Sequence, residues 1–83
     1  MASSQPMSDK ALAIFAFAAF HQLESGQRVS SVIRQDGAGH QADPEGVAEL
    51  EGKGLARSDD RGVHFTEEGE RMLEDVVGAI RAA

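Results

Sequence analysis

The chain of 83 residues contains no cysteine, no tryptophan and no tyrosine, and only four phenylalanines and two prolines. Without a thiol it can form neither a disulfide nor a zinc–thiolate site, and it has no cysteine nucleophile. Hydrophobic residues make up 41% and charged residues 27%, a composition typical of a folded domain. A core of this size is marginal by itself, and self-association is a common remedy.

Long apolar runs are also missing, since the longest covers only residues 11–20. Ten helical residues span about 15 Å, half of a bilayer core, so we expect no transmembrane helix and no membrane partner. A secretory signal is disfavoured because the leader carries one Lys10 beside one Asp9 instead of a positive region. We therefore expect a cytoplasmic protein, with residues 1–7 as a flexible leader and residues 8–83 as one domain.

Basic residues are scarce in the second half of the chain. Residues 1–42 hold three acids and three bases, whereas residues 43–83 hold eleven acids and five bases, which accounts for the net charge of −6. Phosphate attraction supplies nearly all non-specific affinity for DNA, so this half is poorly suited to touch a nucleic acid.

Periodicity and turn residues predict a mostly helical α+β chain. We expect helices over 8–24, 44–53 and 67–82, a strand over 28–30, a short helix from Ser30 or Ser31 through Gln35, a loop over 36–42, and a hairpin of strands 55–58 and 63–65. The predicted helix N-caps are Ser8, Asp43 and Thr66, and Gly26 and Gly54 are placed at helix ends. Val63 and Phe65 share one strand face, with His64 opposite, so Phe65 should enter the core.

The first predicted helix carries two apolar stripes. One consists of Leu12, Phe15, Ala16, Ala19 and Leu23, widened by Phe20, and the other of Ile14, Phe17, Ala18 and His21. Two stripes exceed what one small core needs, so we predict a homodimer that buries Ile14, Phe17 and His21 only in the assembly. His21 is also the best candidate for a pH-sensitive contact.

The segment Gly54-Leu-Ala-Arg-Ser-Asp-Asp-Arg-Gly-Val-His-Phe-Thr-Glu-Glu-Gly-Glu-Arg-Met72 resembles the wing of winged helix-turn-helix proteins, especially MarR- and PadR-type regulators. The resemblance covers roughly residues 8–82. It implies the winged-helix order of helix, strand, two helices, β-hairpin and helix, with the helix at 44–53 as the DNA-recognition helix. It also implies that Arg34, Arg57 and Arg61 would contact phosphates if the chain bound DNA.

The helix at 44–53 departs from that family pattern because it carries Glu45, Glu49 and Glu51 against a single Lys53. Four carboxylates, counting Asp43, repel phosphates, so we predict that this helix does not read DNA. The three glutamates then form either a solvated face or a docking surface for a protein partner with a basic surface.

No catalytic, metal or cofactor site is expected. No serine has a nucleophile-elbow context, Gly37 and Gly39 lack the remainder of a phosphate-binding loop, and His40 with Asp43 offers too few ligands for a metal. The chain is therefore predicted to be a non-enzymatic winged-helix regulatory or protein–protein interaction module. One alternative is a small dimeric MarR/PadR-like transcriptional regulator. Another is a small-ligand sensor with an apolar pocket between the first and last helices.

Overall fold

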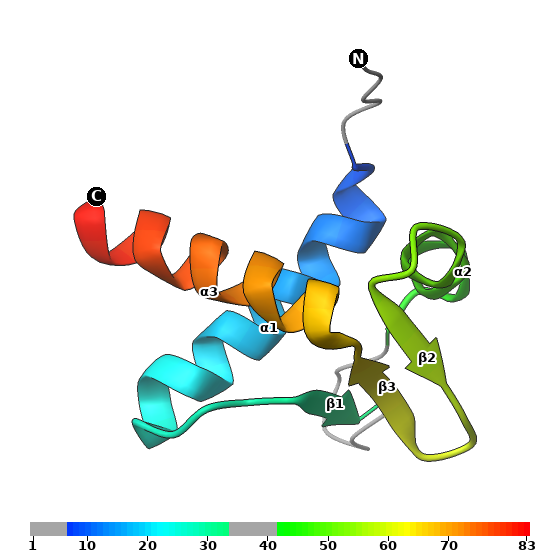
Figure 1. The fold of residues 1–83 in the computed structure, drawn as a ribbon, viewed down its shortest axis with the longest axis horizontal. Helices are drawn as coiled ribbons and strands as arrows, with labels where there is room; N and C mark the ends of the chain where they lie inside the picture. The colour runs from blue at the N-terminus through cyan, green and yellow to red at the C-terminus, as the bar shows by residue number, and fades with distance from the viewer. Residues whose placement is uncertain (1–6, 34–41) are drawn as a thin grey trace.

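The computed structural model describes residues 7–33 and 42–83, and these form an α+β domain of three helices and a three-stranded antiparallel sheet (Figure 1). The elements in chain order are α1 (Asp9–Ser25), β1 (Ser31–Ile33), α2 (Pro44–Gly52), β2 (Ala56–Ser58), β3 (Gly62–Phe65) and α3 (Glu67–Ala82). The helices hold most of these residues, as expected. α1 crosses α3, and the sheet and α2 lie beside this crossing.

The predicted helix caps are confirmed. Ser8 Oγ accepts from the amide of Ala11 at α1, Asp43 caps α2 ahead of Pro44, and Thr66 Oγ1 accepts from the amide of Gly69 at α3. Each oxygen satisfies a backbone donor that the first helical turn leaves without a partner. Gly26 ends α1 with φ +73°, and Gly54 has the same φ just after α2. A glycine adopts this left-handed conformation without steric cost, which allows both helices to end sharply.

The sheet has the order β1-β3-β2, with Val32 opposite Val63 and Arg57 opposite His64. The predicted hairpin is therefore confirmed, but the assignment of residues 28–33 was wrong. The strand lies at Ser31–Ile33, where a helix was expected, because pairing with β3 decides the conformation of a β-branched segment. The rest of that expected helix, and most of the loop after it, lie outside the described residues.

The hairpin turn is organised by Asp59. Its Oδ1 accepts from the amides of Arg61 and Gly62, each at 2.9 Å, and its own amide donates to the carbonyl of Gly62. Gly62 has no positive φ, so the turn does not require it to be glycine. Its role is close approach between strands, because a Cβ there would lie 2.7 Å from the carbonyl oxygen of Val32.

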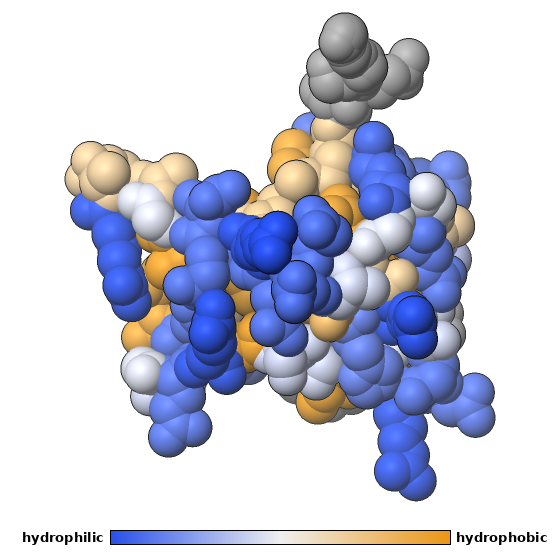
Figure 2. All heavy atoms as spheres, viewed as in Figure 1, coloured by the Kyte–Doolittle hydropathy of each residue, from blue (hydrophilic) through white to orange (hydrophobic). Residues whose placement is uncertain are grey.

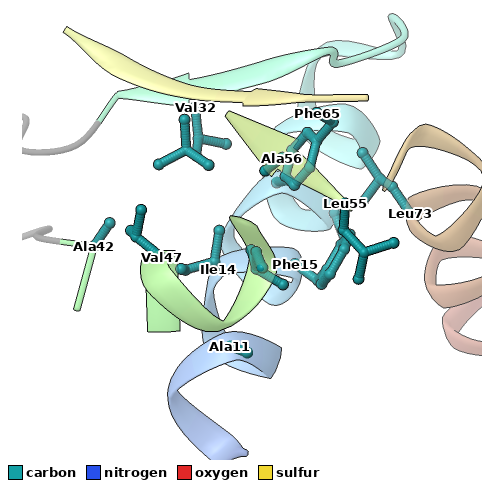
Figure 3. Close-up of a cluster of buried hydrophobic side chains, with 14 of the residues drawn as sticks. Ala11, Ile14, Phe15, Val32, Ala42, Val47, Leu55, Ala56, Phe65 and Leu73 are labelled. Atoms are coloured by element: carbon teal, nitrogen blue, oxygen red, sulfur yellow. The ribbon is translucent and has the colours of Figure 1, made fainter. Parts of the chain in front are cut away.

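The core lies between α1, α2, the inner face of the sheet and α3 (Figure 3). Phe15 is fully buried and stacks on Phe65, with ring centroids 5.2 Å apart. Val63 and Phe65 point inward and His64 is exposed, so the predicted strand register is confirmed. Leu73 of α3 is buried in the same cluster.

Two glycines allow helices to lie close to neighbouring backbone. A Cβ on Gly46 of α2 would lie 2.6 Å from the carbonyl oxygen of Lys10 in α1. A Cβ on Gly69 of α3 would collide with the carbonyl oxygen of Leu55. Neither contact follows from local sequence rules, because each joins segments far apart in the chain.

Candidate functional site

The acidic residues of α2 that face α1 are bonded within the chain. Glu45 Oε1 lies 2.8 Å from Lys10 Nζ, and Asp43 lies 3.9 Å from the same ammonium. Glu49 accepts from the backbone amide of Ser8 at 3.0 Å and from Ser8 Oγ at 2.6 Å. Ser8 thus joins two helices, because its hydroxyl oxygen also caps α1.

These contacts shift the pKa of Glu49 and the pKa of Lys10. The Ser8 hydroxyl, followed by the Ser8 amide, lowers the pKa of Glu49 below its ordinary value. The hydrogen bond to Glu45, followed by the charge of Asp43, raises the pKa of Lys10. Both groups therefore stay charged at neutral pH, as required for holding the start of α1 against α2.

Glu51 faces the hairpin instead. Its Oε2 accepts from the backbone amide of Ser58 at 3.1 Å and from the Ser58 hydroxyl at 3.0 Å. The three glutamates predicted as a docking surface are thus partly solvent-accessible, but each is already engaged by Lys10, Ser8 or Ser58. An incoming basic partner would have to compete with these contacts.

The outward face of α2 is small and offers no donors. Apart from Glu45 and Glu51, the exposed positions of the helix are Pro44, Ala48 and Gly52, which follow one another at intervals of four and share a face. Reading of a base edge in the major groove needs side-chain donors and acceptors. This face supplies none, beyond carboxylates at its borders.

Basic side chains gather on the hairpin. Arg57 is exposed directly opposite the exposed His64, and Arg61 lies in the turn. His64 Nε2 lies 3.1 Å from Asp59 Oδ2, and with the adjacent Asp60 two acids accompany these bases in the turn. The amides of Gly62 and then Arg61 hold the pKa of Asp59 below its ordinary value. Arg34, the third residue predicted to contact phosphate, lies outside the described residues.

An apolar surface covers parts of α1 and α3. Leu12, Phe20 and Leu23 of α1 are 43%, 55% and 38% exposed, and Ile80 of α3 is 47% exposed. Figure 2 shows apolar surface in the angle between the C-terminal parts of these two helices. We refer to these four side chains as the α1/α3 apolar surface. Large apolar side chains that are exposed together on two packed helices often mark an interface.

The residues predicted to make the dimer contact are only partly available for it. Ile14 is 2% exposed within the single chain, so its predicted burial only in a dimer was wrong. The reason is that residues of both predicted stripes of α1 are buried in the core. Phe15 and Ala19 belong to one stripe, and Ile14 and Ala18 belong to the other. Phe17 is half-buried against the core, while His21 is exposed.

The exposed His21 ring packs edge-on against Phe17, with centroids 4.4 Å apart, and also contacts Phe20 at 5.5 Å. His21 is therefore not a core histidine of the single chain. Its place beside Phe20 puts it at the border of the α1/α3 apolar surface. A role for it in a dimer stays a prediction.

Gln22 was not singled out from the sequence, yet it is the one polar residue among the buried side chains of the described segments. Its Oε1 accepts from the amide of Val29 at 3.2 Å, and its Nε2 donates to Glu74 at 2.9 Å. Its position in the sequence could have identified it as buried, because Gln22 follows Ala18 by four residues and therefore lies on the same, buried face of α1.

Two shallow hollows flank β1. One of about 320 Å³ lies between α1 and β1 and is lined partly by His21, Ser25, Val29 and Ile33. The other, of about 220 Å³, lies over the outer face of the sheet and is lined by Arg61, His64 and β1. The expected apolar pocket for a small ligand between the first and last helices is not among these hollows.

Residues 7–33 and 42–83 contain no cluster of three histidine, aspartate or glutamate side chains that could hold a metal ion. None of the helices in these ranges combines the length and hydrophobicity needed to cross a bilayer.

Comparison of the chain with protein-family models, with curated proteins and with solved structures found no match. Functional inference for this chain therefore depends on its own geometry.

Proposed function

We propose that the chain is a winged-helix regulatory or protein–protein interaction module that works as a homodimer and does not catalyse a reaction. The observation that carries this proposal is the α1/α3 apolar surface, made of Leu12, Phe20, Leu23 and Ile80. A marginal 83-residue domain gains stability by covering such a surface, and a second copy supplies an identical one.

The fold supports the winged-helix assignment through its element order. The described order of helix, strand, helix, two strands and helix is that of a winged helix, apart from the second helix of that family. That helix would fall between β1 and α2, where residues 34–41 lie outside the described part of the chain. In this interpretation α2 is the recognition helix and β2–β3 is the wing.

The surface of α2 favours an interaction role over DNA reading. Its outward positions are Pro44, Ala48 and Gly52, and its glutamates repel phosphates while bonding within the chain. A helix with this surface gains neither phosphate attraction nor base contacts.

Sedimentation of the native chain tests the homodimer. We expect a species of twice 8.8 kDa at micromolar concentrations, and a monomer with a native circular dichroism spectrum for Phe20→Asp. Ile33→Asp is the matched control, because Ile33 is 56% exposed on β1 and is not part of the α1/α3 apolar surface, so this change should leave the dimer intact. A native chain that stays monomeric at high micromolar concentration would overturn the dimer.

The second candidate, a DNA-binding regulator of MarR/PadR type, is favoured by one observation, namely that the hairpin exposes Arg57 and Arg61 together. A mobility-shift titration against random duplex at low salt separates the two. The interaction module predicts weak binding. The regulator predicts strong binding whose salt slope falls by about one unit for each phosphate-contacting arginine replaced by alanine.

A further inference from the structure

No strand in the described part of the chain pairs with the outer edge of β1. β1 is an edge strand, since the sheet order is β1-β3-β2. The amide of Phe65 donates to the carbonyl of Ser30, and antiparallel partners alternate between bonded and non-bonded pairs. Val32 therefore bonds to β3, whereas the N–H and C=O groups of Ser31 and Ile33 point away from the sheet.

Apart from the shortness of β1, this edge lacks, within residues 7–33 and 42–83, the features that usually protect an edge strand. Natural proteins blunt such edges with lysine, proline, bulges or a covering element. β1 reads Ser-Val-Ile and pairs without interruption, and Ile33 leaves more than half of its surface exposed. Among the described residues, only β3 pairs with β1.

Hollows lie on both sides of the same strand. The side chains of an added strand would alternate between the two faces of the sheet. Those on the inner face would meet the hollow between α1 and β1, whose apolar lining includes Val29 and Val32. Those on the outer face would lie beside Ser31 and Ile33. The added strand would be two strand spacings, or about 10 Å, away from β3.

One formal positive charge, that of Arg61, lines the hollows at this edge although the chain is acidic. The ionisable groups that line the two hollows are His21, His64 and Arg61, and no carboxylate lines either of them. Asp59 Oδ2 lies 3.1 Å from His64 Nε2, and the exposed Asp60 is its neighbour in the turn. A long acidic side chain on the outer face of an added strand can reach the guanidinium of Arg61.

We propose that the outer edge of β1 binds an extended acidic peptide by β-strand addition. The peptide has apolar residues at alternate positions, which enter the hollow between α1 and β1, and acidic residues between them, which face Arg61 and His64. Main-chain hydrogen bonds to Ser31 and Ile33 supply affinity, and the alternation supplies specificity. A second copy of the chain is a poorer occupant, because its own β1 carries no acidic side chain and it would bring a second Arg61 to the shared sheet.

The probe is the peptide acetyl-Val-Glu-Val-Glu-Val-Glu-Val-amide, and the matched control peptide has lysine in place of each glutamate. Titration of the full chain followed by amide NMR should show saturable binding of the glutamate peptide, at least about tenfold tighter than the lysine peptide at low salt. The amides of Ser31 and Ile33 should exchange rapidly in the free chain and become protected in the complex. Absence of saturable binding up to about 1 mM would overturn the proposal.

Two substitutions at one position isolate the backbone contribution. Ser31→Pro removes only an outward N–H, which edge strands tolerate, whereas Ser31→Ala keeps that N–H. We expect Ser31→Pro to weaken binding at least about tenfold and Ser31→Ala to bind like the native chain. Equal binding by the two variants would overturn the proposal.

A modified peptide gives the same test if Ser31→Pro does not fold. N-methylation of the peptide residues that face β1 should abolish binding to the native chain, and N-methylation at the alternate positions should not. Equal effects of the two patterns would overturn strand addition. Protection of the Ser31 and Ile33 amides before peptide is added would also overturn it. Such protection would mean that the chain itself covers the edge, or, if it grows with protein concentration, a second copy.

Discussion

Replacement of Phe65 by alanine should bring the domain close to unfolding. Phe65 is 7% exposed and stacks on the fully buried Phe15. A buried aromatic ring removes about 150–250 Å² from water, which at about 25 cal/mol per Å² corresponds to roughly 4–6 kcal/mol. Alanine retains a small part of this contact, so the expected loss is about 3–5 kcal/mol.

That loss is large compared with the total free energy of unfolding of the domain. At about 0.05–0.15 kcal/mol per residue, a domain of 83 residues has a free energy of unfolding of roughly 4–12 kcal/mol. The chain has no tryptophan, so urea unfolding should be followed by far-ultraviolet circular dichroism. The matched control is His64→Ala, one residue earlier on the exposed face, whose exposed ion pair with Asp59 makes the expected loss less than about 1 kcal/mol.

A loss below about 1 kcal/mol for Phe65→Ala would refute the reasoning. It would mean that the Phe65 ring is not part of the core. The faces of β3 would then be exchanged, with His64 turned toward the core and Phe65 toward solvent. A large loss for His64→Ala, with a small one for Phe65→Ala, would lead to the same conclusion.

Three further predictions follow from the backbone contacts and the shifted carboxylates. Gly69→Ala should lower the free energy of unfolding by about 1–3 kcal/mol or more, because its Cβ would collide with the carbonyl of Leu55; a neutral effect in urea unfolding would mean that α3 can move away. Gly54→Ala should cost about 1–2 kcal/mol through its φ of +73° alone, since its Cβ would meet nothing within 4 Å; thermal unfolding measures this, and an unchanged midpoint would contradict it. Glu49 and Asp59 have folded-state pKa values below their ordinary values of 4.5 and 3.8, so their stabilisation is complete above those values and is lost as the pH falls through the folded-state values. The urea concentration at the unfolding midpoint, measured from pH 6 to pH 2, should therefore decrease once the pH is below about 4.5. Glu49→Gln should remove part of this decrease.

Local rules accounted for much of the fold. The caps at Ser8, Asp43 and Thr66 and the glycine at the end of α1 could be predicted because each depends on a few adjacent residues. The strand at Ser31–Ile33 could not, because its conformation is decided by pairing with β3, some thirty positions later in the chain.

The candidate site depended more heavily on distant contacts. The sequence shows that α2 carries glutamates, but not that Glu49 bonds to Ser8 or that Glu51 bonds to Ser58. Similarly, the excess of apolar residues on α1 was predictable. Their division between the core and the exposed surface was not, because the position of α3 determines it.

The amide of Gln22 bridges the segment that leads into β1 and the helix α3. Its oxygen holds the backbone just before β1 and its nitrogen holds Glu74 of α3, so the group cannot rotate by half a turn without facing each partner with the wrong polarity. If dimerisation displaces α3, this planar group is a direct contact through which the segment before β1 would be affected. Coupling free energy is reciprocal, so a peptide added at β1 would then change dimer affinity by the same factor as dimerisation changes peptide affinity.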